Sequence, residues 1–216
     1  MKRTSIKTSL RRGLYVVTDC VNLDTRVLLE RTRRILEAGV SVLQYRDKTT
    51  DASLRLQRAS ALRRLCSGYN TVFLVNDDVE LAVDVDADGV HVGRDDTAYP
   101  ECRARLGTNA IIGVSCYNQF ELAIQAQALG ADYVAFGAFY PTSTKHTQYR
   151  ADTDLLTQGR RRLNVPQVAI GGITPDNGAE LVNAGADLLA VVSSVYSSDD
   201  PRQVVREFNR MFDVGG

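Results

Sequence analysis

The sequence predicts a single α/β domain folded as a closed (β/α)₈ TIM barrel. Eight short apolar segments alternate with helical segments, and successive strands start about 20–35 residues apart, which suits βαβ units. Turn residues recur where a helix gives way to a strand, at Gly39, Asp88-Gly89, Gly130 and Gly185. The 216-residue chain also has no linker or break in composition, so its eight units fit one domain.

In the first four units, an apolar strand is followed by a polar turn and a helix. Asp24 and Asp51 stand where an N-cap is needed, because an aspartate side chain accepts a hydrogen bond from the first turn of a helix. The strands are predicted at 13–19, 40–43, 71–75 and 89–93; the helices run from Asp24 to Gly39, from Asp51 through Leu65, through Leu81 and Val83, and over 102–106.

The last four units repeat this pattern. Gly130 ends one helix, and Pro175 is predicted to open another, because proline is favoured in a first helical turn. The strands are predicted at 110–115, 133–137, 167–172 and 188–192, with helices at 118–129, 152–163, from Pro175 onward and at 201–212. An open, doubly wound sheet is the alternative, but the first strand–helix turn lacks G-x-G-x-x-G and no Walker A sequence occurs.

The domain is predicted to span 13–216, after a flexible basic tail at 1–12. That tail carries five Lys and Arg residues among Ser and Thr but no apolar segment of the secretory type; a short organellar transit segment is the alternative. The four cysteines form no C-x-x-C pair and only two histidines occur, which argues against a zinc site or a disulfide framework. Reduced thiols fit a cytoplasmic protein.

Net charge and hydropathy limit the classes of binding partner that can be expected. Lys plus Arg and Asp plus Glu both total 26, so the formal net charge is zero. This balance argues against nucleic acid or an anionic membrane as a partner, and no apolar run is long enough to span a bilayer. Small-molecule substrates are therefore expected, while self-association into a homo-oligomer is left open.

Polar residues collect directly after the predicted strands, where barrels of this class carry their active sites. Side chains alternate along a strand, so Gln44, Arg46 and Lys48 project to one side and Tyr45 and Asp47 to the other. Further polar or glycine-containing strand ends hold Asn76 and Asp77, Arg94 to Asp96, Ser115, Thr142 to Lys145, Gly171 and Gly172, and Ser193. Each has an ordinary structural explanation, such as a helix cap or tight turn, but their shared position favours one site.

Three parts of a site follow from this chemistry. Arg46, Lys48 and Lys145 suit a ligand with several negative charges, such as a diphosphate. Asp77 and Asp96 are a minimal pair of Mg²⁺ ligands. The last two strand ends, at Gly171-Gly172 and Val192-Ser193, suit a phosphate bound by backbone N–H groups.

The catalytic motifs that the sequence lacks limit the types of reaction that can be expected. The sequence has no nucleophile elbow and no Cys–His pairing. A packed core role is favoured for His91 over a catalytic one. Cations and a metal without a clear nucleophile fit the departure of a diphosphate.

Five of these segments, taken together and in order, resemble the thiamine-phosphate synthase family. They are QYRDK at 44–48, NDD at 76–78, HVGRDD at 91–96, TSTK at 142–145 and IGGI at 170–173. The resemblance extends from about residue 13 to the C-terminal helix. One departure is Arg94, where the family commonly has Gln.

The resemblance implies a transferase that couples 4-amino-2-methyl-5-(diphosphooxymethyl)pyrimidine with a thiazole phosphate or its carboxylated form, giving thiamine phosphate and pyrophosphate by a Mg²⁺-assisted dissociative substitution. It implies catalytic roles for Arg46, Lys48, Ser115 and Lys145, and Asp77 and Asp96 as metal ligands. The implied contacts to the pyrimidine diphosphate are Gln44, Tyr45, Arg46, Asp47, Lys48, Asn76, Ser115 and Lys145; those to the thiazole phosphate are Thr142, Ser143, Thr144, Gly172, Val192 and Ser193.

Other functions remain as alternatives. A thiazole tautomerase-like relative would share the barrel and the thiazole phosphate site but would not need the cations and the acidic pair together. An isomerase or lyase of tryptophan synthesis would need a general acid–base pair, whereas these carboxylates suit metal binding better. A non-catalytic protein that binds thiamine precursors would bind without turnover.

Overall fold

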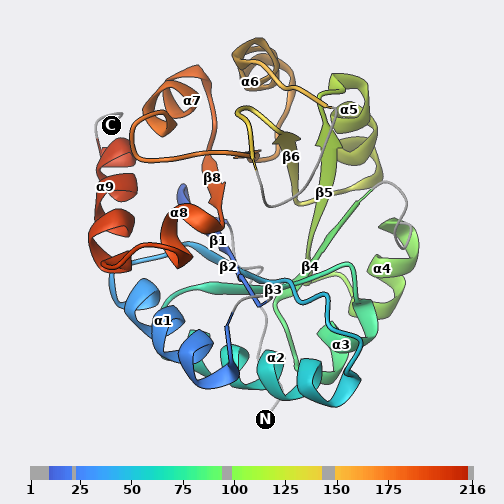
Figure 1. Ribbon diagram of the computed structural model, residues 1–216. Helices are drawn as coiled ribbons and strands as arrows, with labels where there is room; N and C mark the ends of the chain where they lie inside the picture. Colours follow the sequence, from blue (N-terminus) through green and yellow to red (C-terminus); the bar gives the residue numbers. More distant parts are fainter. Residues whose placement is uncertain (1–9, 21–22, 94–98, 143–148, 214–216) are drawn as a thin grey trace.

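The parallel strands close into a barrel in chain order, so the prediction of a (β/α)₈ TIM barrel is confirmed (Figure 1). The computed structural model describes residues 10–20, 23–93, 99–142 and 149–213. Within these ranges eight strands are hydrogen-bonded in sequence, and β1 pairs with β8 through Tyr15 opposite Ala190. This last pairing closes the sheet and rules out the open alternative.

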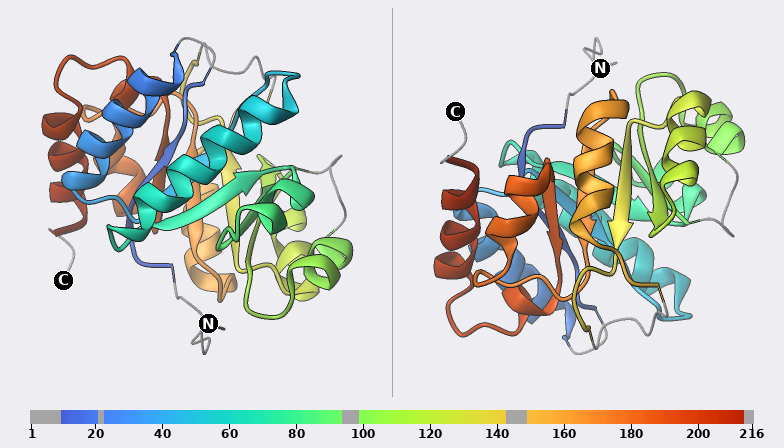
Figure 2. Two further views of the ribbon diagram at one scale, coloured as in Figure 1. Left: turned by 90° about the horizontal axis from the view of Figure 1, so that it is seen from below. Right: turned by 90° about the horizontal axis from the view of Figure 1, so that it is seen from above.

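Helices surround the strands, as Figures 1 and 2 show. The elements are, in order, β1 (Gly13–Val17), α1 (Thr25–Glu37), β2 (Val42–Tyr45), α2 (Ala52–Ser67), β3 (Val72–Asn76), α3 (Val79–Asp84), β4 (Gly89–Val92), α4 (Tyr99–Leu106), β5 (Ile111–Tyr117), α5 (Phe120–Leu129), β6 (Tyr133–Gly137), α6 (Thr153–Arg162), β7 (Gln167–Ile170), α7 (Gly178–Ala184), β8 (Leu188–Val191), α8 (Ser193–Tyr196) and α9 (Pro201–Asp213). None of the described helices is long and apolar enough to cross a membrane.

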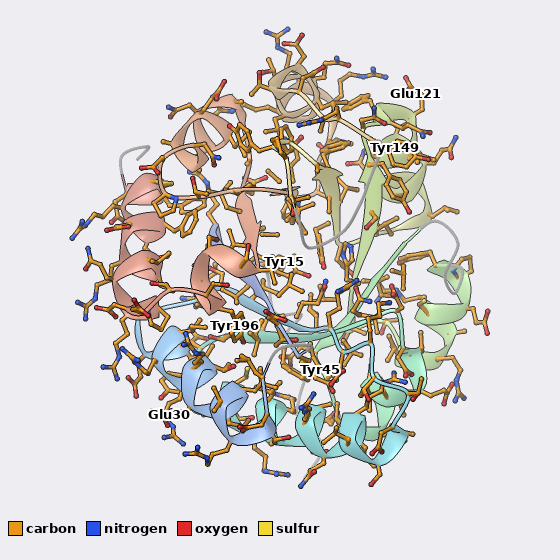
Figure 3. The ribbon with its side chains drawn as sticks, viewed as in Figure 1. Tyr15, Glu30, Tyr45, Glu121, Tyr149 and Tyr196 are labelled. Atoms are coloured by element: carbon orange, nitrogen blue, oxygen red, sulfur yellow. The ribbon has the colours of Figure 1, made fainter. Side chains whose placement is uncertain are left out.

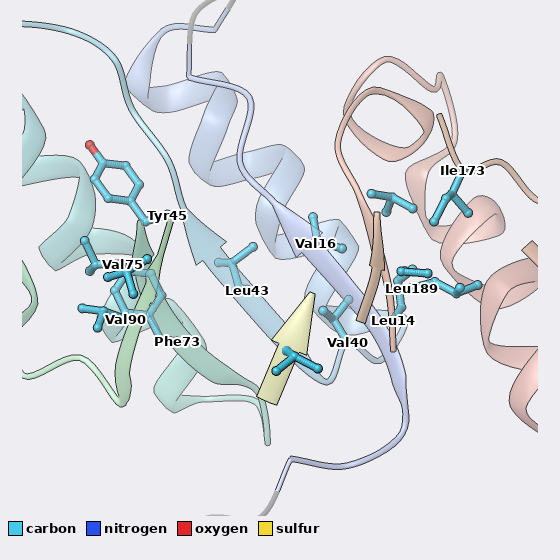
Figure 4. Close-up of a cluster of buried hydrophobic side chains, with 14 of the residues drawn as sticks. Leu14, Val16, Val40, Leu43, Tyr45, Phe73, Val75, Val90, Ile173 and Leu189 are labelled. Carbon is cyan, nitrogen blue, oxygen red and sulfur yellow. The ribbon is translucent and has the colours of Figure 1, made fainter. Parts of the chain in front are cut away.

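Alternation along the strands separates two apolar layers. One set of positions, including Tyr15, Val42 and Tyr133, fills the barrel interior. The next positions along the chain, such as Leu43 and Tyr45, pack outward against the helices (Figure 4). Because every strand is buried on both faces, the sequence shows short continuous apolar runs rather than a polar alternation.

Local signals in the sequence set most helix starts. The Asp24 and Asp51 side chains accept hydrogen bonds from Val27 N and Leu54 N, so both predicted N-caps are confirmed. The prediction for Pro175 was wrong: α7 begins at Gly178, and Pro175 lies in the preceding turn. That turn is held by Asn177, which stands at the N-cap position and whose Oδ1 accepts from Thr174 N at 2.9 Å.

Part of the predicted tail contacts the barrel. Leu10 packs on the interior cluster, Arg11 donates to the carbonyl of Asn70 at 2.6 Å, and Arg12 lies 3.9 Å from Asp187. Residues 1–9 lie outside the described ranges. All four cysteines are free and buried.

Candidate active site

A cavity of about 200 Å³ opens at the carboxyl ends of the strands. Its lining comes from most of the strands and includes both apolar side chains, such as Val168, and polar ones. Of the residues expected from the sequence, the structure brings together Gln44, Arg46, Asn76, Ser115, Thr142, Gly172, Val192 and Ser193. The expected site residues Asp96, Ser143, Thr144 and Lys145, together with Arg94, lie outside the described ranges.

Gln44 and Arg46 reach the cavity from the end of β2. Gln44 is 5% exposed, and both side chains line the cavity. Thr18, just after β1, fixes the backbone of Arg46: its Oγ1 accepts from Arg46 N at 2.9 Å and donates to Arg46 O at 3.1 Å. The backbone that bears the Arg46 guanidinium is therefore held in place by hydrogen bonds to the residue that follows the neighbouring strand β1.

Tyr45 and Asp47 lie on the opposite side of this segment. Tyr45 belongs to the outer apolar cluster, near Val75 and Val90 in Figure 4, and its hydroxyl donates to Asp47 Oδ2 at 3.0 Å. Figure 3 shows Tyr15 and Tyr45 in separate places. The predicted alternation explains this arrangement, but it turns both side chains away from the cavity, where contacts to the pyrimidine diphosphate had been expected.

Arg58 on α2, which the sequence analysis did not single out, links the loops after β1 and β2. Its guanidinium pairs with Asp47 at 2.9 Å and donates to Cys20 O, Leu23 O and Thr25 Oγ1. The Arg58 and Asp47 side chains are 8% and 2% exposed. A guanidinium offers several donors in one plane, which suits a buried junction between loops.

Asp77 and Asp78 follow β3, and their side chains make different contacts. Asp77 adopts a left-handed backbone with φ 62°, and its Oδ2 lies 3.7 Å from Lys48 Nζ. Both had been expected at the site, but neither side chain is among those that line the cavity. Asp78 instead caps α3 by accepting from Leu81 N, and it pairs with Arg55. Of these two carboxylates, Asp77 is the one that lies beside a cation expected at the site, Lys48.

The donor chemistry at Asp77 fits Mg²⁺. Among the described residues no group of three His, Cys, Asp or Glu side chains could hold a metal ion. Mg²⁺ does not need such a group, because it binds through one or two carboxylates and takes water and substrate phosphate oxygens as its other ligands. Asp77 can supply one carboxylate, and Asp96, the expected second, lies outside the described part of the chain.

Gly171 and Gly172 form a tight turn after β7, with φ values of 106° and 63°. A Cβ on Gly172 would lie 2.3 Å from Pro141 O, so the turn packs directly on the backbone of the loop after β6. After the neighbouring strand β8, Val192 stands at the N-cap position of the short helix α8, which begins at Ser193. Backbone N–H groups can therefore approach a phosphate from two adjacent strand ends.

Gly172→Ala is expected to destabilise the fold and to raise the KM for a thiazole phosphate. The added methyl group would collide with the backbone at Pro141 and force a left-handed conformation, at a combined cost of about 2–4 kcal/mol in the free energy of unfolding. Gly107→Ala is the matched control, since Gly107 has φ 83° but nothing within 4 Å of an added Cβ. Denaturant unfolding and KM measurements on both variants would contradict the assignment if the two behaved alike.

A chain of hydrogen bonds crosses the barrel interior, and most of its members line the cavity. It runs from Gln44 Nε2 to Tyr15 OH (2.7 Å), on to Tyr133 OH (2.8 Å), to His91 Nδ1 (2.9 Å), and from His91 Nε2 to Ser115 Oγ (2.8 Å). Burial raises the pKa values of both tyrosines well above the usual phenol value, so both remain protonated. The tyrosines had been taken as part of apolar strands; their regular spacing gave no signal that their hydroxyls meet.

Comparisons with known proteins identify the family of this chain. The profile of the thiamine monophosphate synthase family matches residues 14–195. A thiamine-phosphate synthase of Thioalkalivibrio sulfidiphilus is 49% identical over 203 residues, which cover 94% of this chain and 96% of that protein. One from an Azoarcus species is 49% identical over 201 residues, covering 93% and 97%.

A solved structure supports the same relationship. The thiamine phosphate pyrophosphorylase from Pyrococcus furiosus matches with a TM-score of 0.85 and 32% identity, covering 96% of this chain and 98% of that chain. An orotidine 5′-phosphate decarboxylase from Pyrococcus horikoshii, at 14% identity and a TM-score of 0.67, shares the fold alone. The resemblance found in the sequence is confirmed: this chain belongs to the thiamine monophosphate synthase family.

Proposed function

We propose that the protein is a transferase that joins 4-amino-2-methyl-5-(diphosphooxymethyl)pyrimidine to a thiazole phosphate, releasing pyrophosphate. One observation carries this assignment beyond family membership. The same cavity is lined by Gln44 and Arg46 at the end of β2, by Ser115 on β5, and by Gly172 and Ser193 after β7 and β8. A cavity with a cation on one side and a glycine turn on the other suits two anionic substrates held by different means.

The diphosphate is assigned to the cationic side. Arg46 and Lys48, with Lys145 from the loop after β6, would bind its oxygens and stabilise the charge that grows on the leaving group. Asp77 and Asp96 would hold Mg²⁺, which would neutralise further charge on the departing diphosphate. Asn76 donates to the Asp77 carboxylate and so would keep it oriented.

The two heterocycles would meet in the less polar part of the cavity. Gln44 and Ser115 would hold the aminopyrimidine, while Thr142, Ser143, Thr144, Gly172, Val192 and Ser193 would hold the thiazole phosphate. In the dissociative pathway, pyrophosphate leaves first, the electron-rich ring stabilises the benzylic-type cation, and the thiazole nitrogen captures it. Apolar walls at Val17, Ala135 and Val168 would limit capture of that cation by water.

Tyr45 and Asp47 are assigned an indirect part in this site. Their side chains tie the 44–48 segment to Arg58 and α2, so they would set the position of Arg46 and Lys48 without touching substrate. The four buried, reduced thiols are consistent with work in the cytoplasm.

Pyrophosphate release tests the proposal. The protein is mixed with both substrates, with each substrate alone, and with both in the presence of EDTA, while pyrophosphate and thiamine phosphate are measured. Release that requires both substrates and Mg²⁺ is expected. Interconversion of thiazole carboxylate tautomers without coupling would favour a tautomerase-like protein. Binding of both substrates without turnover would favour a non-catalytic precursor-binding protein.

A further inference from the structure

The hydrogen-bonded chain at the cavity has one direction in which each buried hydroxyl finds an acceptor. Gln44 Nε2 can only donate, so Tyr15 accepts from it. Either tyrosine oxygen could donate in the Tyr15–Tyr133 bond, but the Tyr15 hydroxyl, 2% exposed, has an acceptor among the described residues only when it donates to Tyr133. Tyr133 then donates to His91 Nδ1, and His91 is the tautomer protonated at Nε2, which donates to Ser115.

The two ends of this hydrogen-bonded chain offer opposite groups to the cavity, an acceptor at one end and a donor at the other. At one end, Gln44 uses its amide nitrogen on Tyr15, which leaves Oε1 to accept. At the other, Ser115 accepts from His91, which leaves its hydroxyl hydrogen to donate. Both residues line the cavity, as do Tyr15 and His91, whereas Tyr133 is 0% exposed and does not line it.

The barrel is built to hold this chain. Gly113 lies opposite Tyr133 in the β5–β6 register, and a Cβ there would fall 1.8 Å from Tyr133 Cζ, so only glycine leaves room for the ring. The His91 and Tyr133 rings stack with centroids 5.6 Å apart. These packing constraints fix the two rings as well as their hydrogen bonds.

We propose that Tyr15, Tyr133 and His91 are positioning residues that set the hydrogen-bonding direction of Gln44 and Ser115 and so select a 4-aminopyrimidine over a 4-oxopyrimidine. This inference rests on the proposed function. A 4-aminopyrimidine offers an N–H donor beside a ring-nitrogen acceptor, which matches an acceptor at Gln44 and a donor at Ser115. The 4-oxo analogue, as its N–H tautomer, offers the reverse pattern and leaves polar groups unpaired.

Tyr133→Phe tests the selectivity. Loss of this hydroxyl breaks the chain in the middle, so Gln44 and Ser115 are free to take either direction. We expect the ratio of kcat/KM for the amino and oxo pyrimidine diphosphates to fall at least about tenfold, with the KM for the thiazole phosphate unchanged. Tyr196→Phe is the matched control, because Tyr196 is equally buried and its hydroxyl bonds Thr32 at 2.7 Å, in the α1–α8 contact. An unchanged ratio in Tyr133→Phe, or an equal fall in Tyr196→Phe, would overturn the proposal.

The tautomer of His91 gives a test that needs no turnover. The chain has only two histidines, so ¹⁵N-histidine labelling yields two imidazole signals, and His146→Gln assigns them. We expect His91 to carry its hydrogen on Nε2 in the wild type. A hydrogen on Nδ1 would reverse the chain and overturn the proposal, even in a protein that couples the substrates. Failure of the wild type to release pyrophosphate would instead count against the proposed function.

Discussion

Replacing Arg58 by methionine is expected to lower the free energy of unfolding by about 3–5 kcal/mol at neutral pH. The substitution leaves the Asp47 carboxylate, 2% exposed, without its cationic partner, and leaves the carbonyls of Cys20 and Leu23 without a donor. Denaturant unfolding measures the loss. Arg105→Met is the control, because the Arg105–Glu80 pair lies on the surface with both side chains more than half exposed, where an ion pair contributes about 0–1 kcal/mol.

The effect of Arg58→Met should shrink in acid. Burial opposes ionisation of Asp47, but hydrogen bonds from the Thr49 backbone and Arg58 outweigh it and hold the pKa of the carboxyl below its usual value of 3.8. A depressed pKa stabilises the fold above the unfolded pKa, and this contribution is lost as the pH falls through the lower folded value. The gap between wild type and variant should therefore be widest near neutral pH and narrow below about pH 4. A gap that is constant with pH would mean that packing, not charge, explains the loss.

The same variant should also affect activity through the 44–48 segment. Arg58 is not among the residues that line the cavity, yet it anchors Asp47, which lies between Arg46 and Lys48 in the chain. We expect a raised KM for the pyrimidine diphosphate and little change in the KM for the thiazole phosphate. Adding Asp47→Leu to Arg58→Met should recover stability, because it removes the unpaired buried charge, but it should not restore the KM.

The fold was predictable because local and global signals agree. Strand and helix alternation gave the order of units, and Asp24 and Asp51 marked two helix starts correctly. Pro175 misled because a proline suits a turn as well as a first helical turn, and only the Asn177–Thr174 bond distinguishes the two. The short helix α8 was also missed, since four residues carry no measurable periodicity.

The site was predictable where chemistry follows from position along a strand. Alternation separates Gln44 and Arg46 from Tyr45 and Asp47, and the structure has this separation. What the sequence does not reveal is contact between distant segments. Tyr15 and Tyr133 become hydrogen-bond partners only because the closed barrel directs both side chains, from β1 and β6, into its interior. Arg58 can link two loops only because α2 packs beside the loop after β1. Their residue types alone are compatible with an ordinary core and an ordinary helix surface.

Asp77→Asn is expected to reduce kcat/KM by about 10²–10³-fold and to weaken the response to Mg²⁺. The change removes one negative charge but almost no volume, and asparagine tolerates the left-handed conformation that Asp77 adopts at φ 62°. The fold should therefore remain as stable as the wild type, so lost activity would report lost ligand chemistry. Titrating Mg²⁺ while pyrophosphate release is followed measures the effect directly.

The neighbouring carboxylate provides the control for this experiment. Asp78→Asn keeps a good N-cap on α3 but loses the ion pair with Arg55, so it should cost up to about 1 kcal/mol of stability and leave the Mg²⁺ titration unchanged. The two substitutions are chemically identical and one residue apart. If both variants lost activity to the same extent, the loop after β3 would act through its shape, and the assignment of Asp77 as a metal ligand would be wrong. If only Asp77→Asn shifts the titration, charge at that one position is what the diphosphate side of the cavity requires.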